Sequence, residues 1–221
     1  MAEHTITFST FLKLLELPDG GKKSALRGFL RAGGYRYWRP LQELARPVAK
    51  KELSLSELQE QVAIMAKGHQ RKYNEAALTS LLKWVSRRTI VVHKSPDKQL
   101  KEFGTAGLKI KLDPELTFSM GGIEYLMHVW ATNSPPLSEE TLSMGLYFFR
   151  SCFTKLYPNH QYLIFDTVKN NVFTELAILD SAKEMLAAQR NKLDKIWTEL
   201  NTSDDEHFPD EHPDSHAPPP L

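Results

Sequence analysis

Cysteine is almost absent from this chain of 221 residues, which contains a single one, Cys152. One cysteine cannot form a disulfide within the chain. Such usage is typical of compartments in which thiols stay reduced, so we expect a cytoplasmic location. Cys152 lies between Phe149 and Phe153 in an apolar segment. That setting favours a buried small hydrophobic residue over a reactive nucleophile.

Long apolar runs are also missing. No stretch approaches the roughly 18 consecutive apolar residues that a membrane-spanning helix needs. The N-terminal sequence MAEHTITFST lacks the charged and then apolar pattern of a secretory signal. We therefore expect no membrane partner. Hydrophobic residues still make up 41% of the chain, which is enough for the core of one large domain or two small ones.

Motifs of known catalytic chemistry are missing as well, and no pattern of Ser, His and Asp has a recognisable nucleophile signature. The segment 21–24 (GKKS) has only a faint likeness to a phosphate-binding loop, which needs a glycine five residues before its Gly-Lys pair and a hydroxyl residue directly after the lysine. This chain has Glu16 and Lys23 at those positions. His93 and His128 have no partner at a metal-ligand spacing, and we interpret them as structural histidines.

The formal net charge of +1 hides an asymmetry along the chain. Residues 1–105 contain 19 lysines and arginines against 10 acids, whereas residues 106–221 contain 9 against 17. A basic half joined to an acidic half suggests a site for a polyanion, or self-association, at one end.

The N-terminal region has the apolar periodicity of five short helices, punctuated by glycine and proline. Ser54 and Glu57 have the spacing of a capping box at the start of the fourth helix. The expected helices are 7–17, 22–32, 40–50, 55–68 and 74–87. We interpret residues 1–88 as a helical, basic region in which these helices form a compact bundle.

A strand pattern follows. Apolar residues alternate with lysines over the first expected strand, and Pro114 should take the chain out of the sheet. Gly121 and Gly122 can adopt the positive φ angles of a tight hairpin between the next two. The expected strands are 108–112, 116–120 and 123–130. The β-branched segment 89–93 is interpreted as an edge strand, and the polar segment 94–107 as a linker or mobile loop.

The remaining elements complete an α+β pattern over residues 89–200. Ser138 is a typical N-cap residue for a central amphipathic helix. The expected elements are this helix (138–157), strands at 161–166 and 172–177, and a long C-terminal helix (179–200). The predicted fold is thus an N-terminal helical bundle followed by a small, mostly antiparallel sheet with flanking helices and a long C-terminal helix.

The composition changes at residue 201. Residues 203–221 contain six acids, three histidines, five prolines and no lysine or arginine. Such a segment cannot bury enough apolar surface to fold, so we expect residues 201–221 to be a disordered acidic tail.

The strongest local feature is a basic cluster over residues 22–51, in which nine lysines and arginines face one acid, Glu43. Lysine and arginine neutralise phosphates, and exposed aromatic residues stack on unpaired bases. The residues predicted to bind nucleic acid are Lys22, Lys23, Arg27, Arg31, Arg36, Tyr37, Trp38 and Arg39. The alternative interpretation is a solvated helix face whose aromatic residues pack in the bundle.

Carboxylates near the expected strand ends give a second hypothesis. Two or three carboxylates around Mg²⁺, with a nearby lysine, are what a metal-dependent nuclease needs. The candidate residues are Asp113, Glu115, Asp166 and Lys169. The arrangement loosely resembles restriction-endonuclease-like folds, but it lacks their triplet of an acid, any residue and a lysine, because Lys169 lies one residue too far from Asp166. The alternative is a set of ordinary turn and surface carboxylates.

Three functions follow from these patterns. The leading hypothesis is a non-catalytic cytosolic protein that binds DNA or RNA or acts as an accessory subunit of a complex, with no cofactor. The second is a divergent Mg²⁺-dependent phosphodiesterase. The third is a protein-interaction scaffold that binds a protein partner or another copy of itself without nucleic acid.

Overall fold

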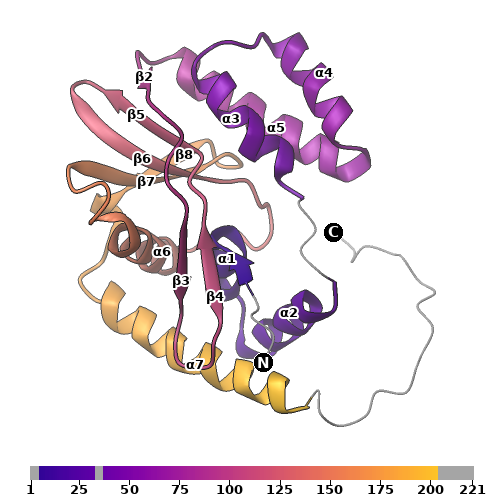
Figure 1. The fold of residues 1–221 in the computed structure, drawn as a ribbon, viewed down its shortest axis with the longest axis vertical. Coiled ribbons are helices and arrows are strands. Elements are labelled where there is room, and N and C mark those ends of the chain that lie inside the picture. The colour runs from indigo at the N-terminus through magenta and orange to yellow at the C-terminus, as the bar shows by residue number, and fades with distance from the viewer. Residues whose placement is uncertain (1–4, 33–36, 204–221) are drawn as a thin grey trace.

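The computed structural model describes residues 5–32 and 37–203, with the backbone alone for residues 29–32 and 203. Within these residues it contains seven α-helices and eight strands. This composition, with helices and strands largely segregated along the chain, confirms the α+β class (Figure 1).

Five helices follow one another in the N-terminal part, as the apolar periodicity predicts. They are α1 (Phe8–Glu16), α2 (Asp19–Ala32), α3 (Arg39–Ala49), α4 (Leu55–Met65) and α5 (Gly68–Ser86). The predicted capping box begins α4, because Ser54 and Glu57 each accept a hydrogen bond from the other's backbone N–H. α2 begins earlier than predicted, since Gly20 and Gly21 lie in its first turn. α5 likewise begins before residue 74.

The larger sheet has the strand order β2-β5-β6-β7-β8. Its strands are β2 (Val91–Val92), β5 (Leu116–Met120), β6 (Ile123–Trp130), β7 (His160–Asp166) and β8 (Asn171–Thr174). β5 and β6 form the predicted hairpin, in which Gly121 and Gly122 have φ angles of 60° and 80°. Neighbouring strands are antiparallel except β6 and β7. β2 is an edge strand, as predicted.

A second, three-stranded sheet corrects the prediction of a linker at residues 94–107. β3 (Gln99–Glu102) pairs antiparallel with β4 (Lys109–Leu112), and β1 (Thr5–Thr7) pairs parallel with the other side of β4. β3 is an edge strand with no fully buried residue, so its sequence lacks the apolar alternation by which strands are recognised. β3 and β4 form a hairpin across residues 103–108, in which Gly104 and Gly107 have positive φ angles.

Helix α6 (Glu139–Phe153) connects the parallel strands β6 and β7, and a 3₁₀ turn (Glu175–Ala177) precedes α7 (Ala182–Ser203). The Ser138 hydroxyl caps α6 by accepting a hydrogen bond from the N–H of Thr141. α7 runs past residue 200, and the rest of the predicted tail, 204–221, lies outside the described residues. No helix in the part of the chain that the structure describes is long and apolar enough to cross a membrane.

Both faces of the larger sheet are buried, each against its own hydrophobic cluster. Leu126 and Trp130 of β6 belong to one cluster, and Met127 and Val129 to the other. This alternation follows from the two-residue period of a strand. α3, α4 and α5 lie on one side of the sheet, and α1, α6 and α7 lie on the other (Figure 1).

The five N-terminal helices therefore do not form one bundle, which corrects that prediction. α1 and α2 pack with α6 and α7, whereas α3, α4 and α5 pack together on the opposite side. An apolar stripe shows which face of a helix is buried but not which partner buries it. Both clusters contain residues from before and after residue 88, so the two predicted regions share their cores.

Candidate nucleic-acid interface

Asn74, in the second turn of α5, fixes the segment that leads into α3. Its side chain is fully buried. Its Oδ1 accepts from the N–H of Leu41 at 3.0 Å, and its Nδ2 donates to the carbonyls of Tyr37 and Gln70 at 3.0 and 2.8 Å. The Gln70 amide donates to the same Tyr37 carbonyl at 3.0 Å. Buried polar contacts thus hold residues 37–41 against α5.

Four rings gather where this segment meets α5, and we call them the aromatic patch: Tyr37, Trp38, His69 and Tyr73. The Tyr37 centroid lies 5.0 Å from Trp38, edge to face, and 6.5 Å from Tyr73. His69 and Tyr73 lie 6.5 Å apart with nearly parallel planes. His69 is exposed and the other three rings are half-buried. Fixed, partly exposed rings provide faces on which unpaired bases can stack.

Positive charge borders the aromatic patch. Lys67 and Lys72 are exposed on α5 and at its N-cap, and neither forms an ion pair with an acid in the described ranges. Two arginines form surface ion pairs with an acid one helical turn further along the same helix. Arg39 pairs with Glu43 and Arg71 with Glu75, both at 2.7 Å. Exposed pairs of this kind contribute little stability, so a phosphate could replace either carboxylate at small cost.

The outer face of α5 extends this surface. Lys72 and Lys83 are about three helical turns apart, and Arg87 follows Lys83 by about one turn, so the three cations lie on one side of the helix. All three are exposed. The positions between them on this side are the small residues Ala76, Thr79 and Ser80. Ala76 is exposed, whereas the Ser80 hydroxyl donates to Asn170 of the turn between β7 and β8 at 3.2 Å. A phosphate backbone could approach this helix face closely near Ala76.

The fold divides the basic cluster predicted over residues 22–51. Lys22 is buried, and its ammonium donates to the carbonyls of Leu15 and Leu17 at the end of α1. Burial lowers the pKa of Lys22. Lys22 is therefore unavailable to a phosphate, which corrects its predicted role. Lys23 pairs with Glu199 of α7 at 2.8 Å.

The other residues of the segment 22–51 have different positions. Arg27 is exposed on α2, which packs against α7, and Arg46 on α3 donates to the His93 carbonyl at 2.8 and 3.1 Å. The side chain of Arg31 and the whole of Arg36 lie outside the described residues. Three predicted residues meet at the aromatic patch or next to it: Tyr37, Trp38 and Arg39.

The carboxylates of the nuclease hypothesis are engaged by other protein groups. Asp166 is buried at the end of β7, and its Oδ1 accepts from the N–H groups of Val168 and Lys169 at 2.9 and 3.0 Å. The Lys169 ammonium donates to the Leu137 carbonyl at 3.3 Å. Asp113 forms ion pairs with two lysines, Lys98 at 2.9 Å and Lys111 at 3.6 Å.

Glu115 is buried just before β5. Its Oε2 accepts from the N–H of Val129 at 2.7 Å and lies 3.1 Å from His128 Nδ1. Among residues 5–32 and 37–203, no group of three or more histidines, cysteines, aspartates or glutamates is placed to hold a metal ion. One oxygen of each carboxylate is bound by protein groups, and the three carboxylates do not gather into a group that fits a Mg²⁺ site.

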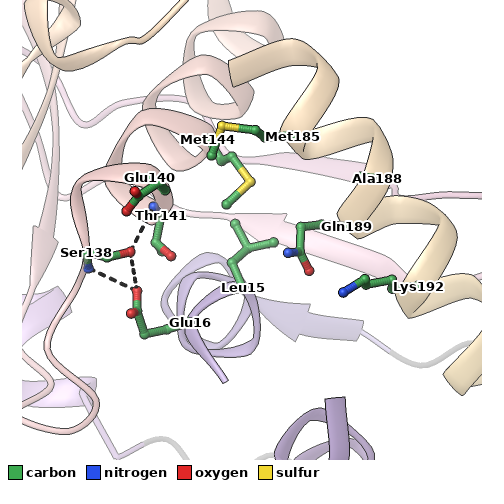
Figure 2. Close-up of a pocket in the computed structure, with 10 residues that line it drawn as sticks. All are labelled: Leu15, Glu16, Ser138, Glu140, Thr141, Met144, Met185, Ala188, Gln189 and Lys192. Carbon is green, nitrogen blue, oxygen red and sulfur yellow. Dashed lines mark hydrogen bonds between the residues drawn. The ribbon is translucent and has the colours of Figure 1, made fainter. Parts of the chain in front are cut away.

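A cavity of about 320 Å³ lies between α1, α6 and α7 (Figure 2). On its wall, Glu16 Oε2 accepts hydrogen bonds from both the N–H and the hydroxyl of Ser138, each at 2.9 Å. Met144 and Met185 form an apolar part of the wall. No residue of the aromatic patch lines this cavity, so it is separate from the candidate interface.

His69, Tyr73 and Asn74 were not identified from the sequence. One signal was available, because His69 and Tyr73 are four residues apart and such residues share a helix face. The link from Asn74 to Tyr37, which are 37 residues apart, had no local signal. No protein-family model matches this chain, and no curated protein sequence matches it.

Proposed function

We propose that this protein binds nucleic acid, single strands in preference to duplexes, through the aromatic patch and the outer face of α5. At this surface we propose binding without catalysis, in the role of an accessory protein that acts alone or within a complex. The single observation that supports it most strongly is the aromatic patch, whose rings are partly exposed and held in place by Asn74. The low cysteine content supports a cytoplasmic site of action.

Two kinds of contact would contribute to binding. Stacking of bases on Tyr73 and its neighbours is worth about 1–3 kcal/mol per base and tolerates any sequence. Lys67, Lys72, Lys83 and Arg87 would neutralise phosphates and release counterions. Because duplexes keep their bases stacked inside the helix, only the second contact is available to them.

The test is fluorescence anisotropy with labelled single-stranded and duplex oligonucleotides over a salt series. Tyr73→Ala should weaken single-strand binding by about 10-fold at every salt concentration. Lys72→Ala should weaken binding to both forms and reduce the slope of log K against log salt by about 0.7 for single strands. Lys155→Ala changes an exposed lysine outside this surface and should leave binding unchanged.

Several results would contradict the proposal. If Tyr73→Ala binds as tightly as the unaltered protein, the aromatic patch is not the stacking surface. If no oligonucleotide binds at low salt, nucleic acid is not the ligand. Cleavage that appears only with Mg²⁺ would favour the phosphodiesterase instead, and a concentration-dependent oligomer that ignores salt would favour the scaffold.

A further inference from the structure

Three side chains from distant parts of the chain form a hydrogen-bonded series across the sheet. Ser9 Oγ, on α1, lies 2.9 Å from Nε2 of His128 on β6. Nδ1 of the same imidazole lies 3.1 Å from Oε2 of Glu115. Ser9 and His128 are 119 residues apart in sequence, which is why no local motif indicates the arrangement.

The partners of the imidazole match one assignment of hydrogen-bond donors and acceptors in this series. Glu115 Oε2 already accepts the N–H of Val129 at 2.7 Å, and an ionised carboxylate can only accept. The tautomer with its proton on Nδ1 can donate to this carboxylate. In that tautomer Nε2 is an acceptor, to which the Ser9 hydroxyl can donate. This hydroxyl, imidazole and carboxylate order is the one that activates a serine nucleophile.

The surroundings hold the imidazole in place. The side chains of His128 and Glu115 are only 6% and 4% exposed. The Phe8 ring meets the imidazole edge to face with centroids 4.8 Å apart, and Phe149 lies 6.4 Å away. Ser9 is only half-buried, so the hydroxyl is the end of the series nearest to solvent.

The position of Ser9 on α1 is also favourable. Thr7 is the N-cap residue and its hydroxyl accepts from the N–H of Thr10 at 3.2 Å, so Ser9 lies in the first turn. The N-terminus of a helix carries partial positive charge. An oxyanion that forms beside Ser9 would be stabilised by this charge.

We propose that Ser9 is a nucleophile toward carboxylic esters, with His128 as the general base and Glu115 as the residue that positions His128. Ser9 Oγ forms a bond to the carbonyl carbon while its proton passes to His128 Nε2. The bond from that carbon to the leaving oxygen then breaks, and the proton passes to the departing alkoxide. Water then releases the acyl group. Its oxygen bonds to the carbonyl carbon while one of its protons passes to His128 Nε2, and the bond from that carbon to Ser9 Oγ breaks as the proton returns to Ser9. This activity is independent of the proposed nucleic-acid binding.

The first test is covalent labelling of the full chain with an alkyl fluorophosphonate, followed by peptide mass spectrometry. Attack by Ser9 forms an oxygen–phosphorus bond and expels fluoride, so the adduct should be found on Ser9. Ser9→Ala should abolish labelling, and Glu115→Gln should slow it by about 100-fold. Ser24→Ala alters an exposed serine of α2 and should have no effect. A folded protein that gains no adduct, or gains one elsewhere, overturns the proposal.

A second measurement avoids dependence on one probe. Ser9→Cys replaces the hydroxyl by a thiol of similar size beside the same imidazole, and alkylation by iodoacetamide then reports on His128 as a base. The native Cys152 is an internal reference, because burial raises its pKa to about 11. The new thiol should react about 100-fold faster than Cys152 or more. In the double variant with Glu115→Gln, most of this difference in rate should disappear. Equal rates in the presence and absence of Glu115 would overturn the assigned roles.

Discussion

Glu16 joins the end of α1 to the start of α6, and its negative charge strengthens that junction. Its carboxylate accepts two hydrogen bonds from Ser138, the N-cap residue of α6 (Figure 2). Burial acts to raise the pKa of Glu16, but the bonds from Ser138 and a contribution from Thr141 outweigh it and hold the pKa below its usual value. The ionised form is therefore the one that the folded state prefers.

Glu16→Gln should lower the free energy of unfolding at pH 7 by about 1–2 kcal/mol, because hydrogen bonds to an ionised acceptor are stronger than those to an amide. A carboxyl with a lowered folded pKa stabilises the fold above its unfolded pKa of about 4.3, and this contribution is lost as the pH falls through the lower folded pKa. The deficit of the variant should therefore shrink below about pH 4. Urea unfolding over a pH series measures it.

Glu60→Gln is the matched control, because Glu60 is exposed on α4 and forms no ion pair within the described residues. Its free energy of unfolding should follow that of the unaltered protein at every pH. If the free energy of unfolding of Glu16→Gln stays below that of the unaltered protein by a constant amount down to about pH 3, the loss comes from a change in hydrogen-bond geometry and not from the missing charge.

The sequence predicts the burial and role of some single residues correctly and of others wrongly. The prediction that Cys152 is a buried small hydrophobic residue is confirmed, since it follows from the apolar helix around it. Lys22 was placed wrongly, because lysine is rarely buried and nothing in its neighbours shows that its ammonium would meet the carbonyls at the end of α1. Local apolar pattern identifies core positions, but it does not identify a polar group that the fold itself binds.

At the scale of elements, Asn74 links α5 to the segment before α3. Asn74→Ala leaves the buried N–H of Leu41 without its acceptor and removes a donor from the Tyr37 carbonyl. Such losses typically cost about 1–3 kcal/mol for each unsatisfied group. We expect the free energy of unfolding to fall by about 3 kcal/mol, and single-strand binding to weaken because the aromatic patch loses its fixed geometry. Chemical denaturation and anisotropy at a temperature where the variant is folded measure the two effects.

Asn191→Ala makes the same change at an exposed position of α7. Alanine has the higher helix propensity, so this control should be neutral or slightly stabilising. If Asn74→Ala destabilises the fold but leaves oligonucleotide affinity unaltered in the folded protein, then the ordering of residues 37–41 does not contribute to binding.

Elements with local signals were predicted well. The hairpin at Gly121 and Gly122 and the capping box at Ser54 depend on residues only a few positions apart. β1 and β3 were not predicted, because each is short. β3 has no fully buried residue to give an apolar alternation, and β1 pairs with β4, which is far away in the sequence. Strand propensity is a weak signal for β1, whose distant partner decides the outcome.

In the molecule as a whole, helices that follow one another in the sequence lie on opposite sides of the larger sheet. The basic cluster was predicted as one surface because its residues are close in sequence, but α2 packs with α7 while α3 packs with α5. Tyr37, Trp38 and Arg39 lie together at the start of α3, on the side of the sheet that α5 covers. The other half of the candidate interface comes from α5, and only the fold brings that half to Tyr37. Topology of this kind is not encoded in local periodicity.

The acidic composition of residues 204–221 has a large effect on the net charge of the whole chain. Ending the chain after Ser203 removes six acids and moves the formal net charge from +1 to +7. Because the field of the whole protein sets its attraction for a polyanion, the shortened chain should bind single-stranded oligonucleotides more tightly at low salt. The gain should fade once the Debye length drops to about 3 Å near 1 M salt.

A full-length variant with all six acids replaced by their amides separates charge from chain length. It should bind as tightly as the shortened chain, because the two have the same formal net charge, and the anisotropy salt series applies to both. If the amide variant binds like the unaltered protein while the shortened chain binds more tightly, residues 204–221 weaken binding by occupying space and not by their charge. If neither variant gains affinity, the charge of the tail does not reach the surface formed by α5 and the aromatic patch, and that surface alone sets the affinity for the oligonucleotide.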